Sequence, residues 1–168
     1  IQGMGGLMSI TGKPHAEPGS GPQKVGVAMV DLSTGLYAAI AVLAALVQRA
    51  RTGRGQYIDL ALLDVAVAML AYQGVNFLAT GKAPDRPGNA HPSIVPYQDF
   101  PTQDGWMMLA VGNDGQFAHF CKCVGHTEWS VDARFATNPQ RVANRKLLVE
   151  MITAVTKTRG TREWITVL

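Results

Sequence analysis

One aspartate, Asp31, has the residue type and position best suited to covalent chemistry. It closes the apolar run 25–31 and precedes a long Ala-rich stretch that predicts a buried helix over 33–51. A carboxylate there would meet the partial positive charge of the helix N-terminus, which keeps it ionised as a nucleophile or base. Aspartate is also a preferred helix N-cap, so a purely structural role explains the same position.

The second candidate is a short polar segment between a predicted strand and a predicted helix. It consists of Gly112, Asn113, Asp114, Gly115 and Gln116. Glycines let backbone N–H groups approach a ligand closely, and such a loop could hold an oxyanion or a phosphate. The spacing matches neither G-x-G-x-x-G nor a P-loop, and an ordinary strand-to-helix turn explains the same residues. On the residues alone, both interpretations stay open.

The remaining polar residues do not form a recognisable metal or nucleophile motif. The four histidines lie far apart without the H-x-x-x-H spacing of a metal site, so no metal is expected. Cys121 and Cys123 are too close together for a disulfide and too few for zinc. They are typical of reduced cysteines in a cytoplasmic protein. No G-x-S-x-G is present, so a hydrolase is not expected.

Composition narrows the class of protein further. The 168 residues are 47% hydrophobic and only 16% charged, which excludes a disordered chain and suggests that other protein covers part of its surface. The net charge of +3 is scattered, so nucleic-acid binding is not expected. The longest uninterrupted apolar run, 35–47, is shorter than the roughly 20 residues that cross a bilayer. We therefore predict a cytoplasmic protein with no membrane segment.

The pattern along the chain predicts a mixed α/β fold with a boundary near residue 88. A Pro-rich linker, 82–93, separates an apolar helical part from a more amphipathic part. Asn138 and Pro139 predict an N-cap and a first helical position, and Thr161 predicts the cap of a last helix. The expected elements are helices over 33–51, 63–79, 115–124 and 139–157, a strand over 57–62, and a hairpin of 94–100 and 106–112 around Asp104-Gly105.

Six stretches in order and in register resemble the class III CoA-transferases, the family of formyl-CoA and carnitine CoA-transferases. Together they span nearly the whole chain. They are I-Q-G-M-G-G-L-M-S-I-T-G, V-G-V-A-M-V-D-L-S-T-G-L-Y-A-A, R-T-G-R-G-Q-Y-I-D-L-A-L-L-D, G-N-A-H-P-S-I-V-P-Y-Q, D-G-W-M-M-L-A-V-G-N-D-G-Q-F and D-A-R-F-A-T-N-P-Q-R-V-A-N-R.

The resemblance implies a role for both candidates. Asp31 occupies the position of the family's nucleophile, which attacks an acyl-CoA thioester and carries CoA as an aspartyl thioester. The segment from Gly112 to Gln116 matches the loop that closes over the acyl group, although Asn113 and Asp114 stand where some relatives have further glycines. Acyl-CoA and a small carboxylic acid would be the substrates. Coenzyme A would enter as substrate, with no permanently bound cofactor.

The resemblance also implies an architecture. Residues 1–87 would end the first segment of a large Rossmann-like domain, mostly helical here, and 88–168 would form an inserted small α+β domain truncated at its C-terminus. Two chains would interlock as a homodimer. Two alternatives stay open. One is a 2-methylacyl-CoA racemase of the same fold, in which Asp31 would act as a base. The other is a non-catalytic fragment that dimerises through apolar helices.

Overall fold

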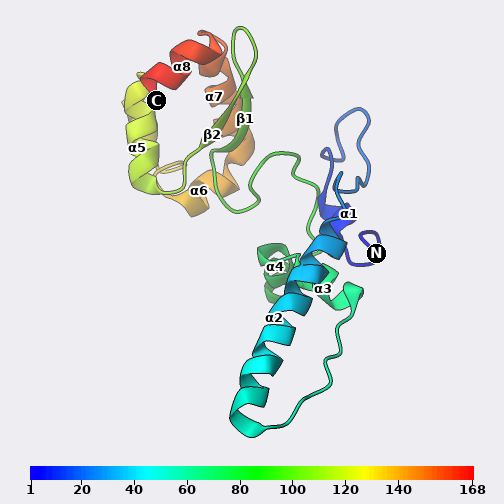
Figure 1. Cartoon of the computed structure of the whole chain (residues 1–168). Coiled ribbons are helices and arrows are strands. Elements are labelled where there is room, and N and C mark those ends of the chain that lie inside the picture. Colours follow the sequence, from blue (N-terminus) through cyan, green and yellow to red (C-terminus); the bar gives the residue numbers. More distant parts are fainter. The chain divides into compact units, whose positions relative to one another are not determined.

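The computed structural model describes all residues from Ile1 to Leu168. The chain divides into two compact units, Ile1–Gly88 and Asn89–Leu168, and each is described by itself (Figure 1). The first unit is helical and the second contains a small sheet. The assignment of 1–87 and 88–168 to a large and a small domain stays a prediction.

The first unit is built around one long helix. Its small core joins Leu7, Val30 and Ala66, with Leu70 packed against them. The elements are α1 (Leu7–Ile10), α2 (Met29–Thr52), α3 (Leu62–Ala68) and α4 (Tyr72–Thr80). The predicted helix over 33–51 is therefore confirmed as α2, although it begins four residues earlier. The expectation that this helix is buried was wrong, because only Val30 and Ser33 are buried in it. Gly53 ends it in the left-handed conformation, with φ of 68°, and donates its N–H to the Arg49 carbonyl.

The length of α2 changes one expectation. An 18-residue window of this helix has a mean hydropathy of 1.9. With 24 residues, the helix is therefore long and apolar enough to cross a membrane. The bent pair of α3 and α4 also meets that test if it is taken as one span. Counting only uninterrupted apolar residues missed this, because isolated polar residues barely lower the mean. Core helices of soluble proteins meet the same test, so composition alone does not place α2 in a membrane.

Two other expectations for the first unit were wrong. Residues 57–62 form no strand: the only sheet is β1–β2, and a strand here would have no partner for its backbone hydrogen bonds. Tyr57 is instead 90% exposed. The predicted helix over 63–79 is broken into α3 and α4, which bend by 77°. The break contains Ala71, whose φ of 49° interrupts the helical hydrogen bonding.

The second unit packs helices against a two-stranded hairpin. Strands β1 (Tyr97–Pro101) and β2 (Trp106–Ala110) are antiparallel, with Tyr97 opposite Ala110, as the turn at Asp104-Gly105 predicted. Phe100, Phe117 and Leu148 lie in the core, each almost fully buried. The helices are α5 (Asp114–Cys123), the short 3₁₀ helix η1 (Thr127–Ser130), α6 (Asn138–Ala143), α7 (Arg145–Thr156) and α8 (Thr161–Val167).

The C-terminal helices correct three expectations. The predicted helix over 139–157 is divided at Asn144 into α6 and α7. Asn138 is the first residue of α6 rather than its N-cap, which is Thr137. Thr161 likewise begins α8 after the N-cap Gly160. In both cases a tertiary partner binds the polar side chain, so it does not cap its own helix.

Candidate active site

Asp31 lies in the first turn of α2, as its third residue. The N-cap position belongs to Ala28, which makes no side-chain cap, so the capping role considered for Asp31 is wrong. The Asp31 side chain is exposed, while its neighbours Val30 and Ser33 are buried and anchor the turn. The carboxylate therefore sits at the positive end of a 24-residue helix and faces solvent, where a thioester could reach it.

The chain entering α2 is fixed by a glutamine near the start of the sequence. The Gln2 side chain accepts from the Val25 backbone N–H at 2.9 Å through its oxygen, and its nitrogen donates to the Val25 carbonyl at 3.4 Å. The side-chain amide of Gln2 thus pairs with both the N–H and the carbonyl of Val25, in the segment before Asp31.

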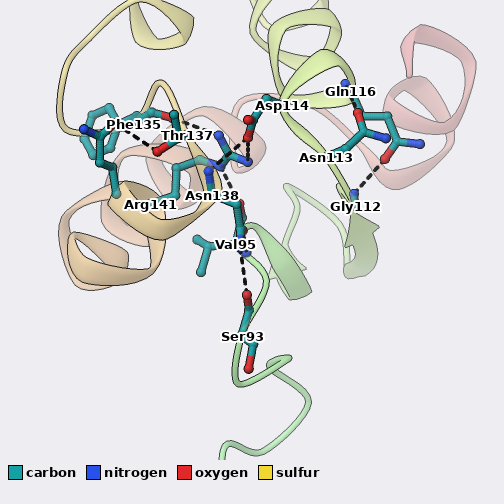
Figure 2. A network of polar contacts seen from close by, with 11 residues as sticks. Ser93, Val95, Gly112, Asn113, Asp114, Gln116, Phe135, Thr137, Asn138 and Arg141 are labelled. Atoms are coloured by element: carbon teal, nitrogen blue, oxygen red, sulfur yellow. Dashed lines mark hydrogen bonds and ion pairs between the residues drawn. The ribbon is translucent and has the colours of Figure 1, made fainter. Parts of the chain in front are cut away.

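The segment from Gly112 to Gln116 forms the start of α5. The Asn113 side-chain oxygen accepts from the Gln116 backbone N–H at 2.9 Å, and the Gln116 side-chain oxygen accepts from the Gly112 N–H at 2.7 Å (Figure 2). These reciprocal bonds resemble a capping box. They leave the backbone N–H groups of Asp114 and Gly115, in the first turn, without an intrahelical acceptor. These two bonds use only the side-chain oxygens of Asn113 and Gln116. The side-chain NH₂ groups of both residues therefore remain as donors.

Asp114 is tied to the rest of the unit. Its Oδ1 accepts from Arg141 Nη2 at 2.8 Å and from the Asn138 backbone N–H at 2.9 Å (Figure 2). The Arg141 side chain is fully buried, whereas half of the Asp114 side chain is exposed. The sequence pattern predicted Asp114 in the loop but gave no sign of Arg141 as its partner.

A second ordered segment, residues 91–95, precedes β1. Arg145 Nη2 donates to the carbonyls of His91, at 2.7 Å, and Pro92, at 2.9 Å. The His91 ring stacks on Tyr97 with 5.4 Å between centroids, and its Nδ1 accepts from the Ser93 N–H. Burial, and secondarily the charge of Arg145, lower the pKa of His91 below its usual range.

A cavity of about 520 Å³ adjoins the start of α5. Asn113, Gln116 and His119 line its polar side, and the end of β2 together with Phe120 lines its apolar side. This volume lies within the range of small-molecule sites. The chain therefore places three of the predicted loop residues, Asn113, Gly115 and Gln116, at a cavity that also offers side-chain donors.

The predicted site residues are divided between the two units. Asp31 belongs to the first, and the segment from Gly112 to Gln116, with the cavity beside it, belongs to the second. Sequence reasoning missed the contacts of Asn138 and Arg141 on α6, which hold Asp114, and of Arg145 on α7, which holds residues 91 and 92. Asn138, Arg141 and Arg145 recur every three or four positions, but this helical spacing of polar residues is equally typical of a solvent-exposed face and does not reveal their contacts.

Comparison with known proteins gives the family. The sequence model of CoA-transferase family III matches residues 1–168. The chain is 47% identical over 166 residues to the succinate–glutarate CoA-transferase of Agrobacterium fabrum, which covers 99% of this chain and 40% of that protein. It is 44% identical over 162 residues to the succinyl-CoA:glutarate CoA-transferase of Mus musculus, covering 96% and 36%.

A solved structure supports the same assignment. The chain is similar to a CaiB/BaiF family protein from Brucella suis, with a TM-score of 0.71 and 49% identity over 98% of this chain and 42% of that one. This chain therefore belongs to CoA-transferase family III, and the mixed α/β fold class is confirmed. It spans about two fifths of the length of these relatives.

Proposed function

We propose that the full-length protein carrying this chain transfers coenzyme A from an acyl-CoA thioester to a small carboxylic acid, with Asp31 as the nucleophile. The observation that carries the proposal is the exposed Asp31 carboxylate in the first turn of α2, in a chain of CoA-transferase family III. A carboxylate at a helix N-terminus meets the partial positive charge of that helix end, and a thioester is reactive enough for it to attack.

The proposed reaction steps require no oxidant and no further co-reactant. An oxygen of Asp31 attacks the thioester carbonyl, and the C–S bond breaks. CoA leaves as a thiolate, and the acyl group remains on Asp31 as a mixed anhydride. That thiolate attacks the Asp31 carbonyl carbon and expels the donor acid, which leaves an aspartyl-CoA thioester. The acceptor carboxylate attacks this thioester and releases the CoA thiolate, which then attacks the acyl carbonyl of the second anhydride and frees Asp31.

The start of α5 supplies the groups that would stabilise charge in these steps. Each attack places negative charge on a carbonyl oxygen, and pre-oriented N–H donors stabilise that oxyanion. The backbone N–H groups of Asp114 and Gly115 fit this role because they lie at a helix N-terminus without an intrahelical acceptor. The NH₂ groups of Asn113 and Gln116, at the adjoining cavity, would bind a carboxylate of the substrate.

Small dicarboxylic acids are the substrates that the relatives suggest. The Agrobacterium fabrum and Mus musculus proteins are named for transfer involving succinate or succinyl-CoA and glutarate. We propose substrates of this class here, with coenzyme A entering and leaving as substrate. We also propose that the protein acts in the cytoplasm as a homodimer, without nucleic-acid or membrane partners.

The test is to trap the adduct on Asp31. The full-length protein is mixed with succinyl-CoA, treated with hydroxylamine, and examined by intact mass and peptide mapping. We expect a hydroxylamine-sensitive adduct on Asp31, and transfer to glutarate in the wild type. Asp31→Asn should lower transfer on the order of a thousandfold or more, as loss of a covalent nucleophile does.

A matched control exists in the neighbouring helix. Asp64 is the exposed third residue of α3, just as Asp31 is the third residue of α2. Asp64→Asn should therefore keep the adduct and the transfer rate. Full transfer by Asp31→Asn would overturn the nucleophile assignment. Exchange of the α-proton of 2-methylacyl-CoA without any transfer would instead identify the racemase.

A further inference from the structure

Arg141 is a fully buried charge with every nitrogen engaged. Nε donates to the Val95 carbonyl at 2.7 Å, Nη1 to the Phe135 carbonyl at 2.9 Å, and Nη2 to Asp114 Oδ1 at 2.8 Å (Figure 2). Its side chain has no exposed surface. Burying a guanidinium is costly unless acceptors surround it, so this arrangement fixes the position of all three acceptors at once.

One of these acceptors belongs to the candidate oxyanion loop. Asp114 is the first residue of α5, and its Oδ1 accepts from the Asn138 backbone N–H as well as from Arg141. The guanidinium also lies over the Phe117 ring, 4.4 Å from its centroid, one turn further along α5. Helix α6 thus contacts the first turn of α5 at Asp114 and at Phe117. This turn carries the N–H groups that we propose stabilise the oxyanion.

A second acceptor belongs to the segment before β1. Arg141 binds the Val95 carbonyl, while the Asn138 side chain accepts from the Val95 N–H at 3.2 Å and donates to the Ser93 carbonyl at 2.9 Å. Both backbone groups of Val95 are therefore bound from α6. One turn of this helix, from Asn138 to Arg141, connects the 93–95 segment to the start of α5.

We propose that Arg141 is a positioning residue for CoA transfer: it fixes the start of α5, through Asp114, to the 93–95 segment, so that the loop N–H groups keep one direction within the second unit. The inference rests on the proposed function. Arg141 has no surface that a substrate could touch, so it acts only through its partners. A loosened loop would both weaken oxyanion stabilisation and admit water to the acyl intermediate.

Arg141→Lys in the full-length protein tests this. Lysine keeps the charge, but one ammonium does not reproduce three donors held in a plane. We expect CoA transfer to fall by about tenfold or more, the effect of losing a hydrogen bond to a charged group. The ratio of succinyl-CoA hydrolysis to transfer should rise severalfold. Hydrolysis measured without enzyme is subtracted first; both remaining rates then scale with the amount of folded enzyme, so a lower folded fraction does not change their ratio.

Two further variants separate positioning from folding. Arg134→Lys is the matched control, because Arg134 is exposed and pairs with Asp132 at 2.6 Å away from the loop; it should leave the ratio unchanged. Asp114→Ala removes the same link from the exposed side and should raise the ratio as Arg141→Lys does. The double variant should be no worse than either single variant, since both break one connection.

Hydrogen exchange distinguishes failure of this inference from failure of the proposed function. The hydrogen-bonded amides of Gly112, Gln116 and Phe117 should exchange about tenfold faster in Arg141→Lys than in the wild type, because opening no longer breaks a charged hydrogen bond. Absence of adduct and transfer in the wild type would overturn the proposed function alone. Unchanged exchange, or an unchanged hydrolysis ratio in an active variant, would overturn the positioning role.

Discussion

Cys121 and Cys123 lie two residues apart on α5 but in different surroundings. Cys121 is fully buried in the core, while Cys123 is partly exposed, with its Sγ 3.6 Å from His119 Nε2. Burial raises the pKa of the Cys121 thiol to about 11, against the smaller opposing effect of Arg141. At pH 8 roughly a thousandth of Cys121 would be thiolate, the form that attacks electrophiles.

We therefore expect only Cys123 to react when the native chain is treated with iodoacetamide at pH 8. Peptide mapping after a short reaction checks this, and rapid labelling of Cys121 in folded protein would contradict it. The result bears on the Asp31 experiment, because acyl-CoA also transfers acyl groups to exposed thiols. Cys123→Ser should remove any such thioester and leave an aspartyl adduct in place.

At the scale of single residues, local pattern located the candidates but not their contacts. Asp31 was predicted beside a helix start because an acid follows an apolar run there. The cap interpretation failed because α2 begins at Met29, before the acid. Arg141 escaped notice because a buried arginine looks in sequence like any surface arginine. Its partners Val95 and Phe135 offer backbone carbonyls, which no side-chain pattern reveals.

At the scale of elements, α8 depends on one tryptophan. Trp164 is almost completely buried, and its Nε1–H donates to the Thr156 carbonyl at the end of α7 at 2.8 Å. Arg159 covers the ring from outside, 4.9 Å from the centroid. A seven-residue helix is too short to be stable alone, so this side chain supplies most of its attachment.

Trp164→Ala should lower the free energy of unfolding by about 3–5 kcal/mol, as truncation of a buried tryptophan does. Trp164→Phe keeps the apolar ring but leaves the Thr156 carbonyl without its donor, and should cost about 1–3 kcal/mol. Trp106→Ala is the matched control, because Trp106 is 65% exposed on β2; its effect should stay within about 0.5 kcal/mol. Urea unfolding followed by far-UV circular dichroism measures all three, and equal losses would contradict the argument.

Elements with a local signal were predictable, and breaks without one were not. The hairpin followed from Asp104-Gly105 between two β-rich runs, because a tight turn is specified by the residues within it. The break near Ala71 lies in residues that favour helix, so no local rule marks it. The prediction of a strand over 57–62 was wrong for a different reason. Its alternation was adequate, but a strand also needs a partner, which local pattern does not supply.

At the scale of the whole molecule, the most unusual feature is the apolar surface of α2. Composition predicted such a surface, since the chain is rich in hydrophobic residues and poor in charge. Five large side chains recur every three or four positions along the helix, each more than half exposed, and form one apolar stripe. The stripe consists of Leu32, Leu36, Ile40, Leu43 and Val47.

We expect the 168-residue chain to self-associate through this stripe, because a contiguous apolar surface of this kind is unfavourable in water. Sedimentation velocity at micromolar concentration should show species larger than a monomer. The double substitution Leu36→Lys with Leu43→Lys should shift the chain toward monomer, since two like charges would then oppose each other across the contact. The matched double substitution, Val131→Lys with Ile165→Lys, adds the same charge at exposed apolar residues of the second unit, 80% and 73% accessible, and should leave association unchanged. A monomeric parent chain, or equal effects of the two doubles, would show that α2 does not carry the contact.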